Sequence, residues 1–217
     1  MPETKPKLVY FKIAGRGELT RLTAAAGGVE IDETMPENWR EYCTERGFPE
    51  ALPLLEHGDF KLNQSGAIVR YVAALAPKFA SLTPQQRAVD DMFACTLEDM
   101  IAAVGGLIFG APDDAPAKLP GIVDKFFGFL EKQLPADGAF VNGEAFPTIS
   151  DLVAFNVVKA YMPFGAAFKL AKDKKPDLPK AFPKLVALAD KVAAAPGVKE
   201  YLATTGGKSV TGAVGNF

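Results

Sequence analysis

The periodicity of the sequence changes part-way along the chain, and this change constrains the fold more than any other feature. Residues 7–75 alternate between short strand-like runs and amphipathic helical runs, whereas helical spacing alone recurs over residues 85–195. Alternation predicts a small α/β unit, and a succession of helices predicts a separate all-α unit. A chain of 217 residues is long enough for one or two compact domains with a sizeable core.

The first unit is predicted to follow the order β-α-β-α-β-β-α. Apolar side chains recur at helical spacing over residues 18–26 and 65–75, and Asn38 is a candidate N-cap for a short helix over residues 38–46. Two apolar pieces flank His57-Gly58-Asp59, which is typical of a β-hairpin. This is the thioredoxin-like arrangement, assigned to residues 1–76. The predicted strands cover residues 7–11, 29–34, 54–56 and 60–62.

The second unit, residues 85–217, is predicted to be all-helical. Residues 77–84 lack periodicity and are expected to be a linker. The helix that starts at Thr83-Pro84 carries apolar side chains at core spacing. A glycine-rich tail from residue 204 is expected to be either loosely ordered or a flap over another surface. The apolar side chains of the helix that starts at Thr83-Pro84 are Met92, Phe93, Leu97, Met100 and Ile101. Further helices are expected over residues 116–134, after a capping box at Thr148–Asp151, and over residues 180–195.

Composition argues against several classes of partner. The net charge of −2 provides no basic surface for nucleic acid or acidic membranes. The longest apolar stretch, residues 101–111, is too short to span a bilayer, and the amino-terminal residues do not resemble a secretory signal. We therefore expect a cytoplasmic protein with free thiols at Cys43 and Cys95. Two cysteines and the single His57 argue against a zinc site, so no metal is expected.

Two short motifs suggest a ligand class. If the Leu52-Pro53 bond is cis, the backbone of Leu52 is free to pair with an extended peptide; the alternative is an ordinary loop proline. Ser65 stands where an N-cap is expected, and the following N–H groups with the Gln64 amide suit a carboxylate. The alternative for Ser65 is a plain N-cap. Together the motifs favour an extended peptide with a carboxylate end.

With these motifs, residues 7–75 resemble the amino-terminal domain of the cytosolic glutathione transferases. The likeness continues into the helical half through Thr96–Asp99 and Thr148–Asp151 and is closest to the sigma class, a branch with a catalytic tyrosine. No Ser, Thr or Cys lies between Leu8 and Glu18, which independently favours a tyrosine enzyme. The matching pieces are Tyr10-Phe11, Gly15–Glu18 with Arg21, Leu52–Glu56, and Gln64-Ser65 with Ala67-Ile68 and Arg70-Tyr71.

The resemblance implies roles for individual residues. Tyr10 matches the tyrosine whose hydroxyl donates a hydrogen bond to the glutathione sulfur and favours the thiolate. The alternative is a Tyr10 that only fills the core. Arg16 matches an arginine that supports the same charge, and Asp99 an acid that reaches the glutathione amino group across a homodimer interface. The remaining glutathione-binding residues implied are Trp39, Ala51, Leu52, Pro53, Gln64 and Ser65.

The sequence departs from the family pattern at the glycyl end of the site. Cys43 stands where a lysine usually contacts the glycyl carboxylate, and Arg40 or Arg46 is a candidate replacement. Cys43 is expected to be an exposed helix cysteine and His57 a solvated turn residue. Phe109, Phe164 and Phe168 are candidates for an apolar cleft, but nothing in the sequence assigns any one of them to it.

The predicted function is a transferase that conjugates the glutathione thiolate to small hydrophobic electrophiles. Two alternatives stay open: a glutathione-dependent isomerase or peroxidase, and a non-catalytic structural or binding protein on the same fold. Retention of Tyr10, Arg16, Gln64 and Ser65 argues against a decayed site.

Overall fold

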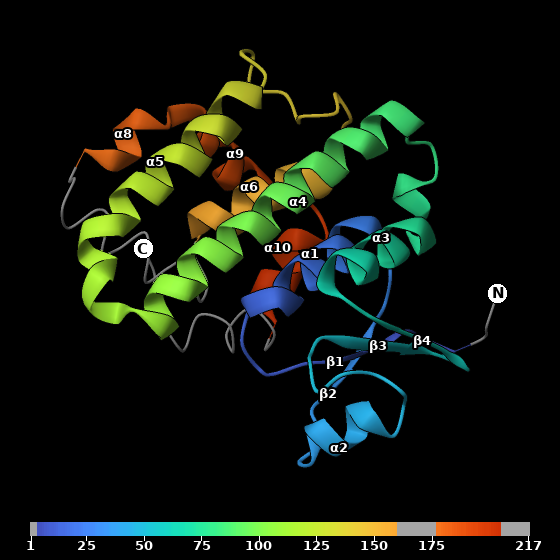
Figure 1. The fold of residues 1–217 in the computed structure, drawn as a ribbon. Coiled ribbons are helices and arrows are strands. Elements are labelled where there is room, and N and C mark those ends of the chain that lie inside the picture. Colours follow the sequence, from blue (N-terminus) through green and yellow to red (C-terminus); the bar gives the residue numbers. More distant parts are fainter. Residues whose placement is uncertain (1–3, 160–176, 205–217) are drawn as a thin grey trace.

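A computed structural model describes residues 4–159 and 177–204. Its first part is built on a four-stranded sheet with the order β2-β1-β3-β4 (Figure 1). Strand β1 runs parallel to β2 and antiparallel to β3, which forms the predicted hairpin with β4. The predicted thioredoxin-like order is confirmed. The strands are β1 (Lys7–Val9), β2 (Asp32–Thr34), β3 (Leu54–His57) and β4 (Phe60–Asn63).

Three helices accompany this sheet: α1 (Glu18–Gly27), α2 (Trp39–Thr44) and α3 (Ser65–Leu75). In Figure 1, α1 and α3 lie between the sheet and the remaining helices, and α2 lies on the opposite side. Leu8 faces Leu55 across the central strand pair, and both are fully buried because helices cover the sheet. The sheet therefore holds Tyr10, which follows β1, at the boundary with α1.

The second part is helical, as predicted. Helix α6 lies at its centre: every residue from Ile149 to Val158 is buried, and the helix packs on α1, α4 and α9. No single described helix is long and apolar enough to cross a membrane, although the pair Pro84–Ile108 and Pro112–Gln133 passes that test jointly across a 106° bend. The helices are α4 (Pro84–Gly105), α5 (Ala115–Gln133), α6 (Ile149–Lys159), α8 (Leu178–Ala181), α9 (Pro183–Ala194) and α10 (Val198–Ala203).

Several local predictions need correction. Met92 is 38% exposed on α4, so it is not a core residue, whereas the other predicted core positions of this helix are buried. The segment 180–195 is two helices, because Pro183 has no N–H to continue α8. Pro77–Phe79 forms a short 3-10 helix inside the predicted linker. The domain boundaries stay predictions, and the glycine-rich tail, Phe164 and Phe168 lie outside the described residues.

The start of α6 is held by a buried polar cluster. The Asp151 carboxylate accepts the backbone N–H groups of Thr148 (2.9 Å) and Val141 (2.8 Å). Of the two hydrogen bonds of the predicted capping box, the one from the Thr148 N–H to the Asp151 carboxylate is confirmed. The Thr148 hydroxyl donates instead to Asp90 on α4 (2.8 Å). Burial raises the pKa of Asp151 to about 6. The cluster ties α6 to α4 and to the loop that precedes it.

Replacing Asp151 by alanine is expected to lower the free energy of unfolding by about 2–4 kcal/mol, because it removes a cap and leaves two buried N–H groups unpaired. Urea denaturation measures this. Asp137→Ala is the matched control, since Asp137 accepts a backbone N–H from Ala139 (3.0 Å) in an exposed loop and is expected to cost below about 1 kcal/mol. Equal losses in both variants would contradict a structural role for the buried cluster.

Candidate active site

A pocket of about 190 Å³ lies where three connecting segments meet. These are the Gly15–Gly17 turn before α1, the chain before β3, and the turn from β4 into α3. The pocket gathers residues that are far apart in the sequence, and all but one of them were predicted to bind glutathione. Its lining residues are Arg16, Ala51, Leu52, Pro53, Asn63, Gln64 and Ser65, of which Asn63 was not predicted.

Tyr10 adjoins this pocket through Arg16. Its side chain is buried at 9% exposure, and its hydroxyl oxygen accepts the backbone N–H of Arg16 at 2.9 Å. Burial raises the pKa of Tyr10, which keeps the hydroxyl protonated. Because the oxygen accepts one hydrogen bond and retains its own hydrogen, Tyr10 can donate a hydrogen bond to a ligand atom.

The glycines on either side of Arg16 allow the turn to pass close over Tyr10. Gly15 has φ +42°, and a side chain there would collide with the Tyr10 hydroxyl. A Cβ at Gly17 would lie 2.5 Å from a ring carbon of Tyr10. The Gly-Arg-Gly sequence therefore lets the Arg16 amide reach the hydroxyl.

Arg21 fixes the chain that follows Tyr10. Its buried guanidinium donates to the carbonyls of Phe11 (3.1 Å) and Ile13 (2.8 Å) and to the Glu33 carboxylate (2.8 Å). Its central carbon also lies 5.8 Å from the centroid of the Tyr10 ring. Sequence reasoning gave Arg21 no role, although its place one helical turn after Glu18 was a signal for an ion pair.

Glu18 connects this arrangement to the last described helix. It is fully buried, with Arg21 Nη1 at 3.4 Å and the Tyr201 hydroxyl of α10 donating to it at 3.0 Å. Burial raises the pKa of Glu18 to about 7. Helix α10 was not predicted, so this link between the chain's two ends was also missed.

The start of α3 differs from its predicted form. Gln64 holds the N-cap position with φ 72°, the only positive φ of a non-glycine residue in the described ranges. Ser65 is the first helical residue rather than the N-cap, and no side chain caps the helix. Its buried hydroxyl donates to Glu98 at 2.6 Å. The uncapped end gives the pocket a wall of positive potential.

The chain before β3 carries the cis peptide bond between Leu52 and Pro53, one of the two predicted alternatives. Cys43 contacts this segment through Sγ, 3.7 Å from the carbonyl oxygen of Ala51. Cys43 is fully buried, with the Ala51 carbonyl against its sulfur, so the expectation of an exposed thiol is wrong. Cys43 and Cys95 are both free thiols, as predicted.

His57 also departs from its prediction. It is the last residue of β3, is 5% exposed, and contacts the Tyr71 hydroxyl (2.8 Å) and the Thr4 carbonyl (2.6 Å). It is a structural residue of the sheet rather than a solvated turn residue, because the amino-terminal segment passes over it.

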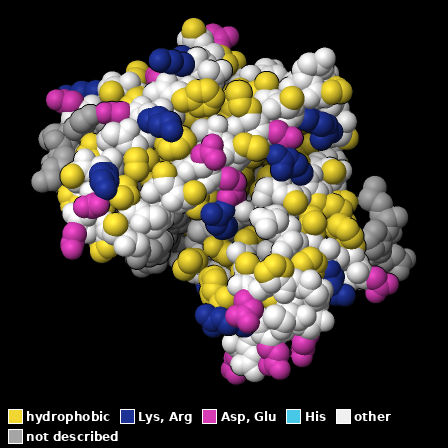
Figure 2. Space-filling model, viewed as in Figure 1, with side chains coloured by type: hydrophobic (Ala, Val, Ile, Leu, Met, Phe, Trp, Pro, Cys, Tyr) yellow, Lys and Arg dark blue, Asp and Glu magenta, His cyan; other side chains and the backbone are white. Residues whose placement is uncertain are grey.

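The two candidate replacements for the family's lysine lie in different environments. Arg46 donates a hydrogen bond to Glu56 at 2.5 Å, and its guanidinium lies over the Tyr42 ring. Its positive charge is therefore already paired within the protein. Arg40 is exposed, with its guanidinium 4.4 Å from the Trp39 ring centroid and 3.5 Å from Glu50. Figure 2 shows acidic side chains gathered over α2, where Arg40 lies. The exposed acids of this region are Glu37, Glu41, Glu45 and Glu50.

Three predicted site residues do not line the pocket: Tyr10, which adjoins it through Arg16, and also Trp39 and Asp99. Trp39 packs edge-on against Phe11 (5.6 Å between ring centroids), which in turn packs against Tyr10 (5.5 Å). Asp99 is exposed on α4. Its neighbour Glu98 instead accepts hydrogen bonds from two residues that do line the pocket, Ser65 and Arg16. The sequence analysis assigned no role to Glu98, although its position directly before Asp99 made it a second candidate acid.

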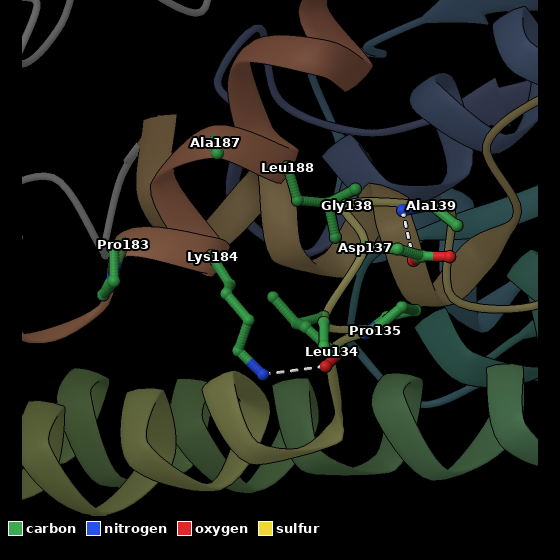
Figure 3. A pocket seen from close by; sticks show the side chains of 10 residues that line it. Leu134, Pro135, Asp137, Gly138, Ala139, Pro183, Lys184, Ala187 and Leu188 are labelled. Atoms are coloured by element: carbon green, nitrogen blue, oxygen red, sulfur yellow. Dashed lines mark hydrogen bonds between the residues drawn. The ribbon is translucent and has the colours of Figure 1, made fainter.

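A larger cavity of about 370 Å³ lies in the helical part, between α9 and the chain that follows α5 (Figure 3). Its walls are mostly apolar, and its polar groups bond one another: Lys184 Nζ donates to the Leu134 carbonyl (2.8 Å), and Asp137 accepts the Ala139 N–H (3.0 Å). It shares no lining residue with the smaller pocket beside Tyr10, so its larger size does not make it the reactive site. Further lining residues are Pro135, Gly138, Pro183, Ala187 and Leu188.

Two family models match the chain and decide its family. Residues 6–74 match the glutathione S-transferase amino-terminal domain, and residues 98–205 match the glutathione S-transferase carboxy-terminal domain. The chain belongs to the glutathione S-transferase family. The predictions of an enzyme of this family, with glutathione as co-substrate, are thereby confirmed. No group of three or more His, Cys, Asp or Glu side chains that could hold a metal occurs within residues 4–159 and 177–204.

Curated relatives in the glutathione S-transferase family cover nearly the whole chain. Glutathione S-transferase A2 of Bos taurus is 29% identical over 206 residues, covering 91% of this chain and 87% of its own length. Glutathione S-transferase alpha-4 of Rattus norvegicus is 28% identical, covering 92% and 89%. These names give the alpha class, so they do not support the sigma-class prediction.

A solved structure has the same fold. The crystal structure of monomeric Na-GST-3, a glutathione S-transferase of the hookworm Necator americanus, superposes with a TM-score of 0.74 at 27% identity, covering 93% of this chain and 98% of its own. NaGST-2 superposes with a TM-score of 0.72, also at 27% identity.

Gly17→Ala is expected to lower the free energy of unfolding by about 1–3 kcal/mol, because the new methyl group overpacks the Tyr10 ring. Urea denaturation measures the change. Gly121→Ala is the control: open space surrounds this exposed position of α5, and alanine there is expected to be neutral or to stabilise by up to about 1 kcal/mol. If the two variants were equally stable, the turn would not be packed tightly on Tyr10.

Glu18 is expected to make stability depend on pH. Its folded-state pKa of about 7 exceeds the unfolded value, so the folded state binds more protons and loses stability as the pH rises from about 4.5 to about 7. Glu18→Gln removes this term. The stability of Glu18→Gln relative to wild type should therefore rise through that window, as measured by urea denaturation at several pH values.

Burial also raises the pKa of Asp90 and Asp151, so these two acids make stability fall with rising pH in the same way. Both acids are present in the wild type and in Glu18→Gln, so their effect cancels in the difference and only that of Glu18 remains. Glu41→Gln, at an exposed position of α2, is the control and should give a difference that does not vary with pH. A pH-independent difference for Glu18→Gln would rule out Glu18 as the source.

Proposed function

We propose that the protein conjugates the glutathione thiolate to small hydrophobic electrophiles and that Tyr10 is the catalytic residue. One observation carries this: a buried, protonated hydroxyl at the pocket edge, oriented by the Arg16 amide, with its hydrogen free for a ligand. A hydrogen bond from that hydroxyl stabilises a thiolate relative to a thiol. The match of residues 6–74 to the glutathione S-transferase amino-terminal domain supports this proposal.

The proposed reaction transfers an alkyl or aryl group to sulfur. The thiol proton passes to solvent, and the thiolate electron pair forms a carbon–sulfur bond with the electrophile. In a substitution, the leaving group departs with its bonding electron pair. In a conjugate addition, the thiolate adds to one carbon of an activated double bond, and the other carbon, which becomes a carbanion, takes a proton from solvent. Tyr10 holds its proton throughout and stabilises the charge on sulfur, with Arg16 adding positive charge nearby.

The pocket supports a binding mode for glutathione. Leu52, with its neighbours Ala51 and Pro53, is proposed to pair with the cysteinyl backbone. Ser65, Gln64 and the uncapped start of α3 are proposed to hold the γ-glutamyl carboxylate.

At the glycyl end, Arg40 is the proposed carboxylate partner, since Arg46 is already paired with Glu56. Trp39 is proposed to line this end of the site through its stacking with Arg40.

Other finer assignments also rest on the resemblance. The sequence prediction of a homodimer, with Asp99 acting on the partner's site, stays a prediction; one solved relative is itself titled monomeric. The sigma class and a cytoplasmic location likewise stay predictions from sequence. Isomerase and peroxidase activities use the same activated thiolate and are the second candidate. The buried hydrogen-bonded Tyr10 argues against a purely structural protein.

Tyr10→Phe is expected to lower kcat/KM for a chromogenic aryl halide about 10²-fold, because it removes the donor to the thiolate. Retention on immobilised glutathione should persist in this variant, since the binding contacts remain. The thiolate absorbance of bound glutathione should appear at higher pH than in the wild type.

Tyr71→Phe is the control, because this tyrosine contacts His57 rather than the pocket. Equal turnover by wild type and Tyr10→Phe would remove Tyr10 from the mechanism. Failure of the wild type to bind glutathione at all would favour the structural alternative.

A further inference from the structure

Helix α10 contacts α1 at two places, and Figure 1 shows the two helices side by side. Towards the end of α1, Gly197 comes so close that a side chain there would collide with the Ala25 carbonyl, and its φ of +86° favours glycine. At the start of α1, the Tyr201 hydroxyl donates to both carboxylate oxygens of Glu18, each at 3.0 Å. Helix α10 is therefore fixed near both ends of α1.

The Tyr201 hydroxyl lies closer to Glu18 than the Arg21 guanidinium does. The Glu18 carboxylate is fully buried, and Arg21 Nη1 lies 3.4 Å from it, against 3.0 Å for the hydroxyl oxygen. Burial raises the pKa of Tyr201, so the hydroxyl keeps its proton and remains a donor. Because a buried carboxylate that loses a donor is destabilised, Tyr201 restricts where the Glu18 side chain lies.

Glu18 is connected to Tyr10 by two routes. Along the backbone, Glu18 directly follows the Gly15–Gly17 turn, in which the Arg16 amide donates to the Tyr10 hydroxyl at 2.9 Å. Through its side chain, Glu18 contacts Arg21, whose guanidinium donates to two carbonyls of the chain that follows Tyr10. A displacement of Glu18 would therefore move both the turn and the chain that hold the Tyr10 side chain.

We propose that Tyr201 is a positioning residue for Tyr10: by fixing Glu18, it keeps the Arg16 amide on the Tyr10 hydroxyl. The proposal rests on the proposed function, in which Tyr10 stabilises the thiolate, and extends the residues that support Tyr10 to α10. A hydroxyl that accepts a well-aligned N–H is polarised by it and donates a stronger hydrogen bond. Without the Tyr201 hydroxyl the turn is less restrained, and Tyr10 stabilises the thiolate less.

The first measurement follows the bond between Arg16 and Tyr10 directly, in the protein without glutathione. Hydrogen exchange of the Arg16 amide, measured by NMR, reports how often this bond opens. Tyr201→Phe should speed the exchange about fivefold, the effect of losing about one hydrogen bond. Tyr10→Phe removes the acceptor itself and should speed the exchange at least as much.

The second measurement is turnover of glutathione with a chromogenic aryl halide. Tyr201→Phe should lower kcat about fivefold and leave KM for glutathione within about twofold, because Arg16 alone among these residues lines the pocket. In a protein that already carries Tyr10→Phe, adding Tyr201→Phe should change kcat by less than about twofold, since its effect passes through the Tyr10 hydroxyl.

Tyr42→Phe is the matched control. Tyr42 donates to Glu56, another buried carboxylate, at 2.8 Å, so the variant removes an equivalent bond from a strand of the sheet. It should leave Arg16 exchange and kcat at their wild-type values. Gly197→Ala is a second variant of α10, which keeps the Tyr201 hydroxyl but displaces the helix. It should change both measurements in the same direction as Tyr201→Phe, and it serves if Tyr201→Phe does not fold.

Three results would overturn the proposal. Equal Arg16 exchange in wild type and Tyr201→Phe would mean that α10 does not restrain the turn. The same loss of kcat in Tyr42→Phe would mean that any lost bond of this kind lowers activity. An undiminished effect of Tyr201→Phe in the Tyr10→Phe protein would mean that Tyr201 acts by another route. A wild type without turnover would count against the proposed function alone, because Arg16 exchange still decides the positioning.

Discussion

The buried guanidinium of Arg21 is the interaction on which the rest of the structure depends. It satisfies two backbone carbonyls of the segment after Tyr10 and pairs with Glu33 and Glu18. A buried charge is stable only when its donors are used, so removing one partner would leave the others uncompensated. The same cluster includes the Tyr201 hydroxyl of α10, and it therefore joins the sheet, Tyr10 and the carboxy-terminal helices into one unit.

The candidate site is a balance of positive and negative groups. The uncapped end of α3 and Arg16 favour anions, while Glu98 places one negative charge among them. At the far end, Arg40 stands among exposed acids over α2. If Arg40 is the glycyl partner as proposed, that end of the site is a solvent-exposed pair, unlike the bonded groups around Ser65.

Sequence reasoning succeeded where local pattern decides structure. The hairpin around Gly58, the helix that starts at Pro84 and the stop at Pro77 follow from turn chemistry and missing N–H groups, which act over a few residues. It failed where distant segments meet. His57 was expected near solvent, and it is buried because the amino-terminal segment around Thr4, 53 residues away, contacts it. Cys43 is buried against the Ala51 carbonyl, in a turn whose path the local pattern did not reveal.

The sequence by itself determined the order of the elements in the α/β part, the change to a helical part, and the residue types available to a glutathione site, because periodicity and short motifs are local properties. Only the tertiary structure decided which of those residues share a pocket, that Ser65 donates to Glu98, and that Arg21 supports Tyr10. Those contacts join residues whose separation along the chain carries no information about their distance in space, and burial then sets their chemistry.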